Sequence, residues 1–196
     1  MCRALLVLDM INDVVATEGA FAPAGFPEQV ARRDVLPHTA AAVAAARQAG
    51  DLVVWVAVGF RPGYLDWPAG SPLFAGLPAT GGLARGGWGT RIHSALEVRP
   101  EEPVIVKSRV SPFHGTELEQ LLRTAGVEEV LLAGVSTDHV VLAAARDAHD
   151  RDFTVRVLAD CCGSSTAELH EAAVSIMASI AEVTTASAAY SMAQAG

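Results

Sequence analysis

The stretch from Val130 to Val141 reads VLLAGVSTDHVV, and it decides the fold. Its apolar beginning predicts a buried strand over 129–133, because a strand that is covered on both faces has a continuous apolar run. Gly134 marks a turn, and a helix is predicted to follow over 137–148. A strand that leads directly into a helix is half of a βαβ unit, the repeating unit of parallel α/β sheets.

The same alternation recurs along the chain. Strands are predicted over 4–8, 52–58, 104–106 and 154–158, and a short last strand is allowed over 181–184. Helices are predicted over 27–48, 116–124 and 167–179, with a kink or a late start at Pro37. We therefore expect an α/β fold: a doubly wound, Rossmann-like three-layer sandwich with a six-stranded, mostly parallel sheet and right-handed crossovers.

Composition restricts the classes of function. The 196 residues suit one compact domain, and the formal net charge is −8 with no basic run. Nucleic acid and membranes are therefore not expected partners, and no apolar stretch reaches the ~20 residues of a membrane span. The chain passes from Cys2 and Arg3 straight into a strand, so no signal peptide is expected. Three cysteines make no disulfide framework, and a cytoplasmic location is expected.

Polar groups end several of the predicted strands. Asp9 and Lys107 each end an apolar run, and the turn 134–137 ends another. Ligands of doubly wound sheets bind outside the carboxyl ends of the strands, so we expect Asp9 and Lys107 to lie within direct or one-water contact on adjacent strands. In one cleft, burial and mutual attraction could leave either group able to move a proton near pH 7. A helix cap or structural ion pair for Asp9, and a solvated side chain for Lys107, are the competing interpretations.

Several segments together resemble the isochorismatase-like (cysteine hydrolase) superfamily in their order and spacing. They are LLVLDM at 5–10, GWGTRI at 87–92, VKSRVSPF at 106–113, GTEL at 115–118, GVST at 134–137, RDA at 146–148 and LAD at 158–160. The segment GFRPGY at 59–64 is similar to a branch of the superfamily in which valine or glycine replaces the cysteine. The resemblance covers nearly the whole chain and implies one isochorismatase-like hydrolase domain over residues 1–196.

The resemblance also identifies an absent nucleophile. In nicotinamidases and carbamoylsarcosine amidases of this superfamily, the catalytic cysteine follows Gly-Val-x-Thr by three residues, and here Val140 holds that place. Asp9 and Lys107 match the family's aspartate and lysine. The resemblance thus implies a hydrolase that works without a thiol, by acid/base chemistry of Asp9 with Lys107, on a small, carboxylate-bearing substrate with a vinyl ether or C–N bond. The alternative is a catalytically silent ligand-binding or scaffold protein of the same fold.

Seven residues are candidates for substrate binding. The Val135–Ser136 turn resembles the family's oxyanion-binding turn, where a non-proline cis peptide is common, and the N–H groups that follow would suit an anion. Ser136 or Thr137 could instead simply cap the helix, and His139 could be a substrate ligand, a general acid or a solvent-facing residue. Arg61 could clamp a carboxylate or lie on the surface. The set is Arg61, Trp88, Phe113, Ser136, Thr137, His139 and Val140, with the two aromatic residues as pocket walls or plain core.

The expected partners are few. Amidases of the superfamily often bind zinc through histidines after the second strand, and the segment 61–67 has no histidine here, so no metal and no cofactor are expected. Cys161 and Cys162 are expected to follow a strand as buried small hydrophobes, which makes an amidase built on either of them the weakest alternative. A small-molecule substrate is the expected ligand. The long aromatic segment 59–89 favours a homodimer or homotetramer.

Overall fold

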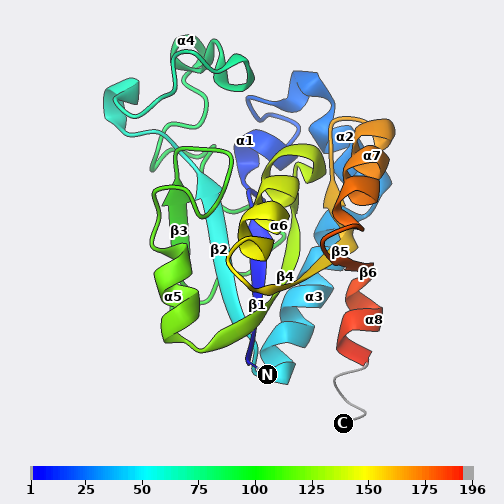
Figure 1. Ribbon diagram of the computed structural model, residues 1–196. Coiled ribbons are helices and arrows are strands. Elements are labelled where there is room, and N and C mark those ends of the chain that lie inside the picture. Colours follow the sequence, from blue (N-terminus) through cyan, green and yellow to red (C-terminus); the bar gives the residue numbers. More distant parts are fainter. Residues whose placement is uncertain (1, 192–196) are drawn as a thin grey trace.

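The computed structural model describes residues 2–191, and a six-stranded parallel sheet forms its centre (Figure 1). The strand order is β3-β2-β1-β4-β5-β6, and all five pairings are parallel. The strands are β1 (Cys2–Leu8), β2 (Leu52–Val58), β3 (Val104–Lys107), β4 (Val127–Val135), β5 (Thr154–Gly163) and β6 (Glu182–Thr184). The predicted doubly wound α/β fold is confirmed, with a sheet that is parallel throughout.

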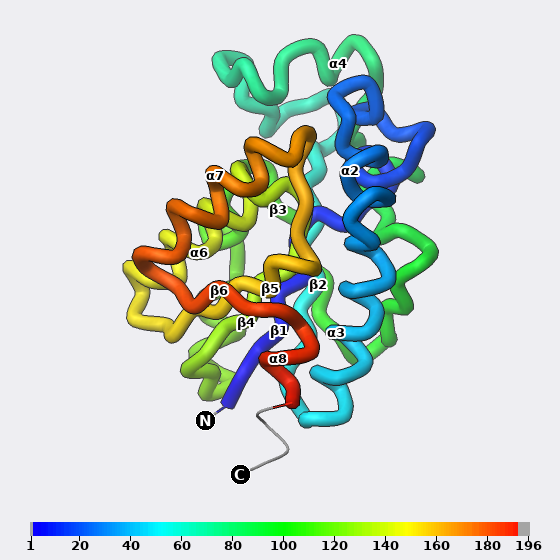
Figure 2. Tube along the Cα trace, turned by 90° about the vertical axis from the view of Figure 1, so that its right-hand side faces the viewer, coloured from blue at the N-terminus to red at the C-terminus, as the bar shows by residue number. Residues whose placement is uncertain are grey.

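Helices cover both faces of the sheet, which explains why the central strands are apolar on both sides (Figures 1 and 2). In β1, Leu5 and Val7 face one core, and Leu6 and Leu8 face the other. The first core includes residues of α1 (Asn12–Val15), α2 (Phe26–Arg32), α3 (Val35–Ala49) and α8 (Ala186–Ser191). The second includes residues of α5 (Leu118–Thr124), α6 (Leu142–His149) and α7 (Ala167–Met177).

Several predicted boundaries differ from the structure. The single helix expected over 27–48 is two helices, because Asp34 adopts a left-handed conformation with φ 50° between α2 and α3. Pro37 lies in the first turn of α3, where a missing N–H breaks no helical bond. The helix expected from residue 137 begins as a π-helical turn, η4 (Thr137–Val141), before α6. The short helix α8 was not predicted.

The strand expected over 154–158 continues to Gly163, so Cys161 and Cys162 lie inside β5 rather than after it. The pairing of β4 with β5 shifts register between Leu132 and Gly134, and the strand resumes beyond this irregularity. Both thiols are fully buried. The expectation of buried small hydrophobes is confirmed, and their position after the strand was wrong.

The segment 59–89 lies over the carboxyl ends of the strands (Figures 1 and 2). It contains the short turns η2 (Pro62–Tyr64) and η3 (Pro72–Phe74) and the helix α4 (Leu77–Thr80); another short turn, η1 (Ala22–Ala24), precedes α2. The buried Asp13 carboxylate accepts the Leu83 N–H at 2.7 Å, and the Asn12 amide donates to the Trp88 carbonyl at 2.9 Å. These bonds fix the segment to α1. In the described chain, no helix is long and apolar enough to cross a membrane.

The close approach of β1 and β4 yields a stability prediction. A Cβ at Gly134 would lie 2.7 Å from both Cβ and O of Leu8, on the strand at the centre of the sheet. We therefore expect Gly134→Ala to lower the free energy of unfolding by about 1–3 kcal/mol in urea titrations, the usual cost of overpacking. Gly70→Ala is the matched control, because a Cβ there meets nothing within 4 Å, and it should change stability by less than about 0.5 kcal/mol. Equal midpoints for the two variants would contradict the packing argument.

Candidate active site

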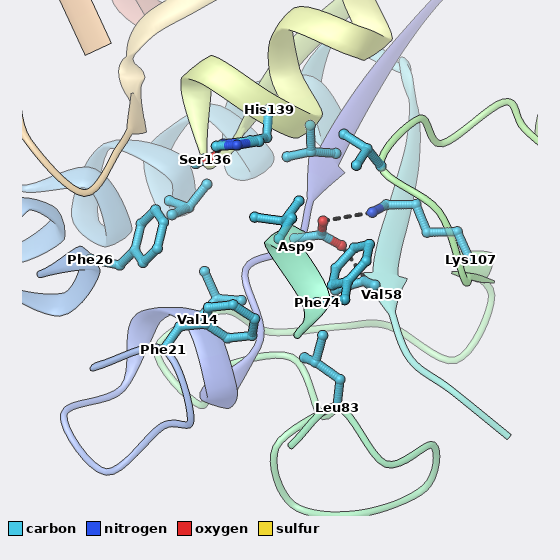
Figure 3. Close-up of a pocket in the computed structure, with 14 residues that line it drawn as sticks. Asp9, Val14, Phe21, Phe26, Val58, Phe74, Leu83, Lys107, Ser136 and His139 are labelled. Carbon is cyan, nitrogen blue, oxygen red and sulfur yellow. Dashed lines mark hydrogen bonds and ion pairs between the residues drawn. The ribbon is translucent and has the colours of Figure 1, made fainter. Parts of the chain in front are cut away.

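Asp9 and Lys107 form a buried ion pair at the carboxyl edge of the sheet. Lys107 Nζ lies 2.8 Å from Asp9 Oδ2, and the two residues are 2% and 5% exposed (Figure 3). Lys107 also donates to the Arg109 carbonyl at 3.0 Å, and Asp9 Oδ1 accepts the Val58 N–H at 2.7 Å. The expected direct contact is confirmed. The expectation of adjacent strands was wrong, because β2 lies between β1 and β3, and the pair reaches across its end.

The conformation of Asp9 explains how the carboxylate crosses β2. Its backbone is left-handed, with φ 52°, a conformation that aspartate tolerates better than most residues. Its N–H still donates to the Val56 carbonyl of β2 at 2.8 Å. Burial raises the pKa of Asp9 above its ordinary value, and the attraction and hydrogen bonds of Lys107 and Val58 offset this only in part. The proton affinity of this carboxylate is therefore higher than that of an exposed aspartate.

The turn after β4 forms the other side of the site. The Val135–Ser136 peptide bond is cis, as the resemblance implied. The chain then enters η4, where the Val141 N–H bonds to the Ser136 carbonyl at 3.1 Å. Thr137 is fully buried, and its Oγ1 lies 2.8 Å from Nδ1 of His170, a buried residue of α7. Because Arg33 can only donate, its contact of 2.8 Å with His170 Nε2 makes Nδ1 the protonated nitrogen, which donates to Thr137.

A small cavity of about 60 Å³ joins these groups. Its polar lining residues are Asp9, Lys107, Ser136 and His139, and its walls are apolar (Figure 3). The apolar lining residues are Val14, Phe21, Phe26, Val58, Leu73, Phe74, Leu83, Val110, Val135 and Val140. Since a water molecule needs on the order of 10–15 Å³ of such space, the cavity has room for water and a small group.

His139 lies at this pocket with its side chain half exposed. Its Nδ1 is 2.9 Å from Asp138 Oδ2 and 3.0 Å from Ser136 Oγ, while Ser164 bonds to the other Asp138 oxygen. Burial opposes ionisation of Asp138, but the bonds from His139 and Ser164 outweigh it and lower the pKa of Asp138 to about 2. The bond to Asp138 raises the pKa of His139 despite partial burial. The pair is therefore a carboxylate and an imidazolium at mildly acidic pH.

The structure brings together some of the seven candidate binding residues and not others. Ser136, His139 and Val140 line the pocket, with Val140 only 2% exposed. Thr137 does not line the pocket; its buried side chain bonds to His170 and holds the turn to α7. The other three lie outside the pocket lining: the Arg61 side chain is 66% exposed beside Asp66, Trp88 is 48% exposed, and Phe113 packs against Phe153 in the second core.

Sequence reasoning missed several residues of the site. Phe21 comes from the irregular segment between α1 and α2, and Phe26 is the first residue of α2, one position before the helix predicted over 27–48. Leu73, Phe74 and Leu83 come from the segment 59–89, where no periodicity marked them. Asp138 was also missed, and its adjacency in sequence to the candidate residue His139 was the one signal that could have identified it. Among residues 2–191, no group of three or more His, Cys, Asp and Glu side chains is arranged to hold a metal ion.

The buried ion pair makes a stability prediction. We expect Lys107→Met to lower the free energy of unfolding at pH 7 by about 3–5 kcal/mol, because it leaves a buried carboxylate without its partner. The pKa of Asp9 is raised in the folded state, so its ionisation makes the free energy of unfolding fall as pH rises above ~4. The loss caused by Lys107→Met should therefore shrink as pH is lowered toward ~4, where Asp9 is protonated. The double variant Asp9→Asn/Lys107→Met should be more stable than Lys107→Met alone in the same urea titrations. A loss that is independent of pH would contradict this account.

Comparisons with known proteins agree with this architecture. An isochorismatase domain model matches residues 3–188. Ureidoacrylate amidohydrolase RutB from Methylorubrum extorquens is 33% identical over 170 residues, which cover 80% of this chain and 67% of that protein. An isochorismatase family protein from Desulfovibrio vulgaris superposes with a TM-score of 0.83 at 28% identity over 97% of each chain. Nicotinamidase PncA from Bacillus subtilis gives 0.79 at 28% identity, over 94% of this chain and all (100%) of that one. The chain therefore belongs to the isochorismatase family of hydrolases.

Proposed function

We propose that this protein hydrolyses a C–N bond of a small substrate without a thiol nucleophile, with Asp9 as the general base that activates water and Lys107 as its electrostatic partner. The observation that carries the proposal is the Asp9–Lys107 pair in the lining of an otherwise apolar pocket. The names of the amidohydrolase and nicotinamidase relatives denote C–N hydrolysis in those proteins and favour the same bond class here.

The state of Asp9 suits proton transfer. A carboxylate can accept about four hydrogen bonds, and Asp9 accepts one at each oxygen, from Val58 and Lys107. Lone pairs therefore remain for a water molecule in the cavity. The raised pKa makes Asp9 a stronger base than an ordinary aspartate, which brings it nearer the optimum for general base catalysis at neutral pH.

The proposed step is balanced in atoms and charge. Asp9 takes a proton from water while the water oxygen bonds to the carbonyl carbon. The C–N bond then breaks, and the proton on Asp9 passes to the leaving nitrogen. Negative charge develops on the carbonyl oxygen, and we place it toward Lys107 and the backbone N–H groups that begin η4, since such donors stabilise an oxyanion.

The cysteines do not offer a comparable nucleophile. Burial raises the pKa of the Cys162 thiol to about 12 and that of Cys161 higher still, so neither forms a thiolate near neutral pH. Cys2 is exposed at the start of β1, at the opposite end of that strand from Asp9. Val140 lines the pocket where the resemblance implies a thiol. Attack by activated water is the remaining route.

A second candidate function is a silent ligand-binding protein. It is favoured by the tight fit of the site, since Val140 is 2% exposed and the cavity is small. A vinyl ether substrate is the other chemical alternative, in which Asp9 would act as an acid and protonate carbon. The direction of the pH dependence separates this chemistry from C–N hydrolysis.

The activity prediction concerns Asp9 and the thiols together. On a panel of small amides and ureides, we expect Asp9→Asn to lower kcat/KM by roughly 10²–10⁴-fold, the usual contribution of a general base. Activity of the wild type should rise with pH through the raised pKa of Asp9, because the ionised form is the active one. Iodoacetamide should label Cys2 without loss of turnover. Activity that falls as pH rises through the pKa of Asp9 itself would favour the vinyl ether chemistry, and no turnover on the panel would favour the silent protein.

A thiol placed at Val140 tests whether the pocket is open. In a Cys2→Ser background, we expect the Val140→Cys thiol to be alkylated by iodoacetamide near neutral pH, because it shares the pocket with Lys107 and follows the start of a helix, and both lower a thiol pKa. Cys161 and Cys162 are the internal controls and should stay unlabelled in intact-protein mass spectra. An inert thiol in a folded variant would mean a closed pocket and count against the hydrolase.

A further inference from the structure

The pocket lining includes an imidazole nitrogen that makes no hydrogen bond in the described part of the chain. Asp9 and Lys107 bond to each other and to backbone groups. Ser136 Oγ is within hydrogen-bond distance of His139 Nδ1, and that nitrogen also meets Asp138. Within residues 2–191, His139 Nε2 makes no hydrogen bond. Because an imidazolium carries two N–H donors, one of them remains available.

The surroundings of His139 fix which nitrogen is free. Asp138 accepts at Nδ1, and Ser164, from the segment after β5, holds the other carboxylate oxygen of Asp138. Because Asp138 bonds to Nδ1, its negative charge lies on that side of the imidazole ring, and it does not line the pocket. A carboxylate of this kind, bonded to one imidazole nitrogen, orients the ring and keeps it protonated.

We propose that the Asp138–His139 pair is the recognition element for a carboxylate ligand, which the Nε2–H of His139 binds at the mouth of the pocket. The inference rests on the proposed function, because it names the substrate class of the same site. The class is a small monocarboxylate that carries the C–N bond to be hydrolysed and is otherwise apolar, since ten apolar side chains line the remaining wall. His139 thus takes the role that the sequence suggested for Arg61, which faces solvent.

The neighbouring charges allow an anion in this place. The titratable and charged groups that share the pocket with His139, or are bonded to the turn and its neighbours, are Asp138, His170, Arg33, Asp9 and Lys107. Burial, together with Arg33, lowers the pKa of His170 to about 4, so it is neutral where His139 is charged. The raised pKa of Asp9 weakens its repulsion of a second carboxylate. The charge of Asp9 is also offset by Lys107, and the hydrogen bonds of Asp138 hold its charge on the Nδ1 side.

The ligand should be lost as His139 deprotonates. The bond to Asp138 raises the pKa of His139, so the charged form persists to higher pH than in a free histidine and disappears as pH rises through that value. If only the imidazolium binds, affinity falls tenfold per pH unit above it. Without Asp138 the fall begins at lower pH.

The experiment is a binding titration with sodium propionate at constant ionic strength, with propionamide as the neutral probe. Protein labelled with ¹³C at histidine Cε1 is followed by NMR between pH 5 and 9. We expect propionate to bind at least tenfold more tightly than propionamide at pH 6, to raise the pKa of His139, and to weaken as pH rises. His139→Gln should lose at least tenfold in affinity and all of the pH dependence.

Two further variants separate recognition from structure. Asp138→Asn should keep propionate binding at pH 5 but shift the loss of binding to lower pH, which a merely structural role for Asp138 would not do. His149→Gln, at the far end of α6, is the matched control and should bind as the wild type does. Three outcomes would overturn the proposal: equal binding of propionate and propionamide, wild-type affinity in His139→Gln, or no binding of propionate at ~0.1 M. None of these results involves turnover, so each leaves the role of Asp9 to be judged separately.

Discussion

The buried ion pair of Asp9 and Lys107 is the constraint on which the rest of the site depends. Its two members come from β1 and β3, and it crosses the end of β2, where Asp9 also accepts the Val58 N–H. Three strands are thus tied together at their carboxyl ends by one carboxylate. Because an isolated buried charge would cost several kcal/mol, the short edge strand β3 must hold Lys107 in place for Asp9 to be tolerated at all. The site and the edge of the sheet are therefore coupled.

Much of this could be predicted from sequence, for identifiable physical reasons. The central strands are buried on both faces, so they appear as unbroken apolar runs, and parallel pairing brings their carboxyl ends to one edge of the sheet. That, together with the positions that match the family, placed Asp9 near Lys107. The strand over 52–58 was predicted, but its position between β1 and β3 was not, because strand order depends on which strands pair, and the apolar runs look alike. The extension of β5 through Cys161 was missed because a register shift interrupts its pairing.

Two candidate residues that lie outside the pocket lining belong to a segment held by long-range contacts. Arg61 and Trp88 lie in an irregular segment whose position is set by the Asp13 carboxylate and the Asn12 amide, far away in sequence. Nothing in the segment itself shows which side chains will face the pocket. The state of His139 likewise depends on Ser164 through Asp138, a contact across 26 residues. Local pattern could identify His139 as a neighbour of the site, but not the carboxylate that orients it.

Val140 connects the packing of the fold to its chemistry. It belongs both to the pocket wall and to the apolar core formed with α5, α6 and α7. Where the resemblance implies a nucleophile, this chain therefore has a side chain that stabilises the second core. An apolar wall there also lowers the local polarity around Asp9, and burial is the main reason that its pKa is raised. The proposed hydrolysis by activated water depends on this setting, a carboxylate with a raised pKa in an apolar pocket.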